Sequence, residues 1–106
     1  MRLLAATLLS AALASPALAA GAPAAAGRGR TLFVAACGSC HWLAAAGTRG
    51  RRGPSLDGER RSYADVVDQV VHGGGGMPAF RASLTRRQIA DIATFPARAT
   101  ASAPDD

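Results

Sequence analysis

The segment VAACGSCHWL, residues 34–43, constrains the fold most, because it holds both cysteines, one of the two histidines and the only tryptophan. Positions three and four apart lie on one face of a helix. Cys37, Cys40 and His41 therefore point toward one object if the helix expected over residues 28–41 forms. Four uses fit such a group: a disulfide, a redox dithiol, part of a zinc site, or an anchor for a covalently attached cofactor.

The N-terminal residues 1–19 have the pattern of a secretory signal peptide. Arg2 precedes an apolar stretch that is too short to span a bilayer, and Ala17-Leu18-Ala19 forms a small-x-small cleavage signal. The sequence therefore predicts export to an oxidising compartment, the periplasm of a bacterium.

The mature chain is expected to be one small domain over residues 28–96. Residues 20–27 read as a flexible tether and residues 97–106 as a disordered tail. A domain of about 70 residues buries little surface and usually needs further stabilisation. A disulfide between cysteines three apart closes a very short loop and contributes little. Something other than the chain is therefore expected to complete the core.

Three helices are predicted, over residues 28–41, 63–72 and 85–95, and no strand pattern is visible. The second has apolar residues at helical spacing, and Gly73 ends it. The third begins with a capping box from Thr85 to Gln88, and Pro96 is expected to end it. Long loops over residues 42–61 and 73–83 lack a pattern, which suits an all-α domain whose loops wrap a group that is not protein.

All twelve basic residues are arginines, and the formal net charge is +5. The arginines are scattered and match no nucleic-acid-binding motif, so no nucleic-acid partner is expected. Positive charge suits an acidic or membrane-bound partner, although it equally serves solubility.

The C-x-x-C-H arrangement is the attachment signal of haem c. The Cys37 and Cys40 thiols can form thioethers with the two vinyl groups of one haem, and His41 then offers the proximal ligand. The alternatives are weaker. A redox dithiol follows a strand in an α/β fold, a disulfide leaves His41 without a purpose, and a zinc site with His72 would use the adjacent Cys40 and His41 in one tetrahedron.

Met77 is the candidate for the second axial ligand, because it is the only methionine left after signal removal. A thioether is a soft neutral ligand that suits haem iron. Methionine usually fills cores, but one placed between glycines and Pro78 fills a core poorly. His72 is the rival, and its position at the end of a helix is typical of a surface histidine.

These residues carry a family resemblance. The chain resembles the small monohaem class I (His–Met) cytochromes c through four motifs in order: Gly29-x-x-x-Phe33-x-x-x-Cys37-x-x-Cys40-His41, Gly53-Pro54-Ser55-Leu56, Met77-Pro78-Ala79-Phe80 and Ile92-x-x-Phe95. The resemblance implies three main helices and long loops wrapped around one covalently bound haem. It also implies that the Pro54 carbonyl accepts a hydrogen bond from His41, and that Gly29 lets the first and last helices cross where Phe33 packs on Phe95.

The function expected on this basis is electron transfer. The protein is predicted to be a monomer that passes single electrons between redox partner proteins by Fe(II)/Fe(III) cycling. It is expected to be no enzyme and to have no small-molecule substrate, although it could serve as the haem subunit of an oxidoreductase complex. Two alternatives stay open: a haem domain that binds a gas or catalyses by displacing Met77, and a thiol-redox or zinc module.

Overall fold

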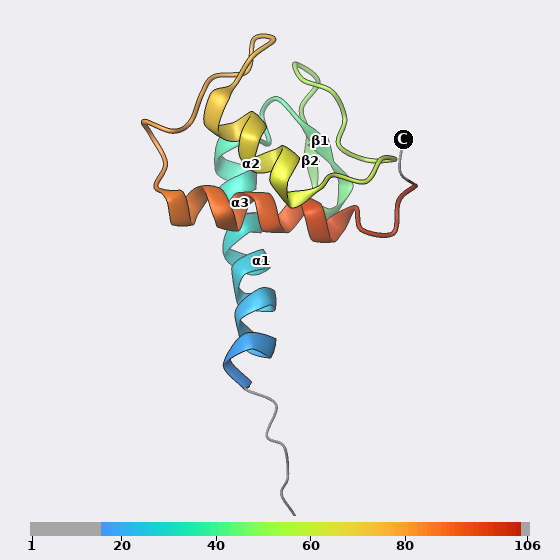
Figure 1. Cartoon of the computed structure of the whole chain (residues 1–106). Coiled ribbons are helices and arrows are strands. Elements are labelled where there is room, and N and C mark those ends of the chain that lie inside the picture. Colours follow the sequence, from blue (N-terminus) through green and yellow to red (C-terminus); the bar gives the residue numbers. More distant parts are fainter. Residues whose placement is uncertain (1–15, 105–106) are drawn as a thin grey trace, which may run out of the picture.

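The computed structural model describes residues 16–104, with side chains from residue 23 on. This part of the chain has three α-helices, with a small two-stranded sheet at their side (Figure 1). In chain order the elements are α1 (Pro16–Ala36), β1 (Trp42–Leu43), the 3-10 helix η1 (Ala44–Ala46), β2 (Thr48–Arg49), α2 (Tyr63–His72) and α3 (Arg86–Ala99). Most of the predicted signal peptide, residues 1–15, lies outside the described residues. Within the described residues, no helix has the length and apolar character needed to cross a membrane.

Helix α1 begins earlier and ends earlier than predicted. It starts at Pro16 and includes residues 20–27, which were expected to form a tether. Alanine, the strongest helix former, dominates this stretch and extends the helix. Figure 1 shows this N-terminal half projecting from the rest of the protein. The α-helix ends at Ala36, but Cys37 O accepts from Cys40 N at 3.1 Å and from His41 N at 2.9 Å, so one further helical turn follows.

The expectation of no strands was wrong, because β1 and β2 form an antiparallel pair with Trp42 opposite Arg49. Gly47, with a φ of 68°, makes the turn between them. The Thr48 hydroxyl donates to His41 O at 2.8 Å and accepts from Leu43 N at 3.1 Å, which ties the pair to the end of the cysteine segment. Strands of two residues are too short to show an alternating pattern.

Helix α2 has the predicted bounds and caps. The Ser62 hydroxyl accepts from Asp65 N at 3.1 Å, as an N-cap does. Gly73, with a φ of 66°, ends the helix and donates to Gln69 O at 2.7 Å. Val70 is buried and faces the core.

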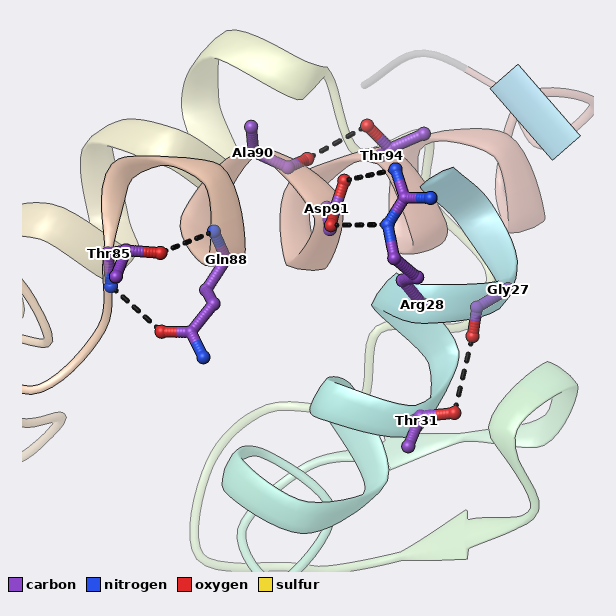
Figure 2. A network of polar contacts seen from close by, with 8 residues as sticks. All are labelled: Gly27, Arg28, Thr31, Thr85, Gln88, Ala90, Asp91 and Thr94. Carbon is purple, nitrogen blue, oxygen red and sulfur yellow. Dashed lines mark hydrogen bonds and ion pairs between the residues drawn. The ribbon is translucent and has the colours of Figure 1, made fainter. Parts of the chain in front are cut away.

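Helix α3 starts with the predicted capping box. Thr85 Oγ1 accepts from Gln88 N at 3.1 Å, and Gln88 Oε1 accepts from Thr85 N at 2.9 Å (Figure 2).

The prediction that Pro96 ends α3 was wrong. A proline inside a helix costs about 3 kcal/mol, but Pro96 is fully buried, and its packing offsets that cost. The helix continues to Ala99, and the residues after it are held in place: Thr100 Oγ1 accepts from Arg61 N at 2.8 Å, and Pro104 O accepts from Arg60 N at 3.1 Å. The predicted tail over residues 97–106 thus begins within helix α3 and then hydrogen-bonds to the loop before α2, and residues 105–106 lie outside the described residues.

Helices α1 and α3 cross at Gly29. A Cβ at this position would overlap the Asp91 carbonyl, so only glycine allows the approach. One turn further on, the Phe33 and Phe95 rings pack with centroids 5.9 Å apart. The Arg28 guanidinium donates from Nε to Asp91 Oδ2 at 2.9 Å (Figure 2), and this hydrogen bond raises the pKa of Arg28. The crossing joins a core of buried apolar residues from all three helices and the hairpin: Phe33, Cys37, Leu43, Ala46, Val70, Ile89, Ile92 and Phe95.

We expect Gly29→Ala to destabilise the protein by about 1–3 kcal/mol, because the added methyl group forces α1 away from α3. Gly27→Ala is the matched control in the same helix, since a Cβ there meets nothing within 4 Å. The control should be neutral or stabilise by about 0.5–1 kcal/mol through helix propensity. Urea denaturation measures the free energy of unfolding of each variant. Equal stability of the two variants would contradict the crossing at Gly29.

Candidate functional site

The His41 imidazole is seated by the Gly53-Pro54 turn. Its Nδ1 donates to the Pro54 carbonyl at 2.8 Å, the hydrogen bond that the family resemblance implied. A Cβ at Gly53 would lie 2.5 Å from His41 Cε1 and 3.0 Å from Nε2, so the ring lies flat against this glycine. With its proton on Nδ1, the ring keeps the Nε2 lone pair for a metal ion.

The same turn is fixed to the cysteine segment. Gly53 N donates to Cys40 O at 2.8 Å. Gly50, earlier in the loop, approaches so closely that a Cβ there would lie 2.6 Å from His41 N and from Cys40 N and C. The loop around Gly50 and Gly53 therefore packs closely against the backbone of Cys40 and His41.

Cys37 and Cys40 are free thiols on the one turn that also carries His41. Cys37 is buried in the core, and burial, with a smaller contribution from Cys40, raises the pKa of Cys37 to about 11. Reactive dithiols work by lowering a cysteine pKa so that the thiolate forms at neutral pH. The Cys37 environment does the opposite, which disfavours a redox dithiol.

Met77 is held by an unusual run of glycines. Gly73 to Gly76 all have a positive φ, between 60° and 124°. The chain folds back so that Gly74 N donates to Met77 O at 2.9 Å and Met77 N donates to Gly74 O at 3.0 Å. A Cβ at Gly73 would lie 2.5 Å from Met77 O, so the fold-back requires glycine there. The backbone of Met77 is thus fixed at both polar groups, and its side chain packs half-buried against the core.

The structure brings His41 and Pro54 together at the cysteine turn. Met77 comes from a different loop, the one between α2 and α3. Figure 1 shows the two loops, residues 50–62 and 73–85, on the same side of α3, opposite the projecting half of α1.

His72 lies at the surface and interacts with its own helix. Its Nδ1 donates to Asp68 O at 3.0 Å and lies 3.1 Å from Asp68 Oδ1, and its side chain is 61% exposed. Across residues 16–104, no three histidine, cysteine or acidic side chains gather as a metal site would require. The zinc alternative through His72 therefore has no support in this geometry.

Arg61 is a candidate that sequence reasoning did not single out among the loop arginines. Its Nη2 donates to Ser55 O at 3.0 Å and lies 3.4 Å from Glu59 Oε2. Its Nε is buried without a hydrogen-bond partner in the described part of the chain. An unsatisfied buried donor costs about 1–3 kcal/mol, so this nitrogen is suited to an acceptor that the chain does not supply. No sequence pattern distinguishes Arg61 from its neighbours.

Comparison with known proteins gives two matches. Residues 24–95 match the family described as cytochrome c oxidase, cbb3-type, subunit III. The crystal structure of the c-type cytochrome SorU from Sinorhizobium meliloti is similar with a TM-score of 0.69 and 30% sequence identity, over 78% of this chain and 99% of that chain. No curated protein matches the chain significantly.

The fold and these matches define a small monohaem c-type cytochrome, all-α, with one covalently bound haem c. More particularly, the chain belongs to the cbb3-type cytochrome c oxidase subunit III family. The residues of this structure fit the group: an imidazole with a free Nε2, two thiols on the same turn and an orphaned Arg61 Nε.

We expect Gly53→Ala to disturb the haem environment of the holoprotein, because the new methyl group must push the His41 ring out of its seat. Gly58→Ala is the control in the same loop; its site is open, and only its φ of 88° strains the new residue, by about 1–2 kcal/mol. Electron paramagnetic resonance of the oxidised proteins should show an altered iron signal for Gly53→Ala alone. An unchanged iron signal in Gly53→Ala would contradict the packing of the His41 ring against Gly53.

Proposed function

We propose that this protein is an exported carrier of single electrons, with haem c attached to Cys37 and Cys40 and its iron ligated by His41 and Met77. The observation that carries the proposal is the seat of His41, with Nδ1 on the Pro54 carbonyl and the ring against Gly53. When bound, haem c supplies an Fe(II)/Fe(III) couple that takes up and releases one electron.

The chain's own part begins with His41. The Pro54 carbonyl holds the proton on Nδ1, fixes the orientation of the ring and makes Nε2 a stronger donor. The thiols of Cys37 and Cys40, on the same turn as His41, are placed where they would form thioethers with a haem. Anchor and ligand are therefore supplied by one short, rigid segment.

Met77 supports an electron carrier rather than a catalyst. Its backbone is held by two reciprocal hydrogen bonds to Gly74, and its side chain is half-buried against the core. A residue fixed in this way resists displacement, and if His41 and Met77 both held the iron, no position would be left for a substrate or a gas. This argues against the haem domain that works by displacing Met77.

Arg61 is assigned to the haem propionates. Its unpaired Nε is a charged donor, and guanidinium groups pair well with carboxylates. The same residue anchors the loop through Ser55 O, so binding the propionate would also fix the loop after Pro54.

Export and partners follow from the sequence. Cleavage after Ala19 would release the protein into the periplasm, where redox partner proteins, acidic or membrane-bound, would exchange electrons with a monomer. The family description names an oxidase subunit, so service as the haem subunit of an oxidoreductase complex belongs to the same proposal.

The oxidised holoprotein is expected to show the weak red absorption band of methionine-to-iron charge transfer, and Met77→Ala is expected to abolish it. His72→Ala is the control, because His72 interacts with Asp68 on its own helix, and this variant should keep the band. The band is measured in absorption spectra of the two variants, each expressed with the haem-attachment machinery.

A band that persists in Met77→Ala would refute Met77 as the ligand. Binding of carbon monoxide to the reduced wild-type protein would favour the ligand-binding alternative over simple electron transfer.

A further inference from the structure

Three arginines beside the haem-attachment segment carry charge that the chain does not neutralise. Arg49, Arg51 and Arg52 are all exposed, and none makes an ion pair or side-chain hydrogen bond within residues 16–104. The acidic side chains of the following loop are engaged elsewhere: the Asp57 carboxylate accepts from Ala44 N at 3.1 Å, and Glu59 lies 3.4 Å from Arg61.

These arginines flank two glycines that pack against the proposed site. Gly50, between Arg49 and Arg51, packs on the backbone of Cys40 and His41, where a Cβ would lie 2.6 Å from the nearest atoms. Gly53, which follows Arg52, donates a hydrogen bond from its backbone N to Cys40 O. The charge is thus held on a loop that packs against the segment with one anchoring thiol and the imidazole. We name residues 49–53 the arginine loop.

A surface hollow of about 330 Å³ opens in the arginine loop. Its lining is Trp42, Gly50, Arg51, Gly53 and Ser55. Two glycines leave room at its wall, Arg51 brings a guanidinium, and the half-buried Trp42 adds an aromatic surface. A carboxylate side chain matches the charge of this lining, since guanidinium binds carboxylates in a bidentate way.

We propose that the arginine loop is the docking surface for an acidic redox protein, which places a carboxylate in the hollow and exchanges its electron at the Cys40–His41 edge. The proposal rests on the proposed electron-carrier function. One electron passes from the reduced partner to the haem iron, so the partner is oxidised, the iron is reduced, and no covalent bond forms or breaks.

A protein partner fits better than an anionic membrane. Binding in a membrane interface needs large apolar side chains beside the basic ones. Among the described residues the exposed large apolar side chains are Val34 and Tyr63, and neither belongs to the arginine loop. A charged surface whose one large apolar side chain, Trp42, is half-buried suits fast, salt-sensitive encounters between proteins.

The test uses holoprotein and reduced flavodoxin, an acidic protein that donates single electrons, in stopped-flow mixing at low ionic strength. The variant Arg49→Gln/Arg51→Gln/Arg52→Gln should lower the second-order rate constant roughly tenfold and flatten its dependence on salt. The control Arg86→Gln/Arg87→Gln/Arg98→Gln removes the same charge from α3 and should change the rate by about twofold or less.

An equal loss of rate in the two variants would overturn the proposal, because net charge would then explain the effect. Binding of the wild type to phosphatidylglycerol vesicles that is lost only in the arginine-loop variant, with an unchanged flavodoxin rate, would overturn it in favour of a lipid surface.

Reduction by dithionite separates the docking proposal from the proposed electron-carrier function. If dithionite produces the reduced c-type spectrum in all three proteins, electron uptake stands and the flavodoxin rates test docking alone. If it does so in none, the proposed function fails.

Discussion

The close crossing of α1 and α3 at Gly29 determines where the rest of the chain lies. Only a residue without a side chain lets the backbone of α1 meet the Asp91 carbonyl, and the Phe33–Phe95 contact and the Arg28–Asp91 ion pair then fix the angle and register. The C-terminal end of α1 leads directly into the cysteine turn. The position of Cys37, Cys40 and His41 is therefore a consequence of helix packing far from the chemistry.

Two loops complete the site, and each depends on glycines for close approach. On one side Gly50 and Gly53 let the loop pack on Cys40 and seat the His41 ring. On the other side the run from Gly73 to Gly76 folds the chain back so that Met77 is held by its own backbone. Both loops are longer than most connections in compact domains, and a bound haem c would give them an apolar surface on which to pack.

The elements with strong local signals were predictable from the sequence. The caps at Ser62, Thr85 and Gly73 fixed the bounds of α2 and the start of α3, and C-x-x-C-H identified the cofactor. The ends of α1 and α3 were not predictable by the same rules, because tertiary packing overrode a local signal: burial keeps Pro96 inside α3, and an alanine-rich stretch becomes helix where a tether was expected. The hairpin after His41 was too short to leave a pattern, and the orphaned Arg61 Nε depends on contacts that no single sequence displays. The ligand roles of His41 and Met77 remain predictions that this geometry supports.

The central claim is that one haem is attached through both cysteines of the turn that ends α1. Intact-mass measurement of the purified, denatured protein, followed by peptide mapping, tests it most directly. The account predicts the mass of the chain cleaved after Ala19 plus one haem, carried on the peptide that contains Cys37 and Cys40, with no alkylatable thiol. A mass without haem, with two thiols that alkylate or are joined in a disulfide, would contradict it.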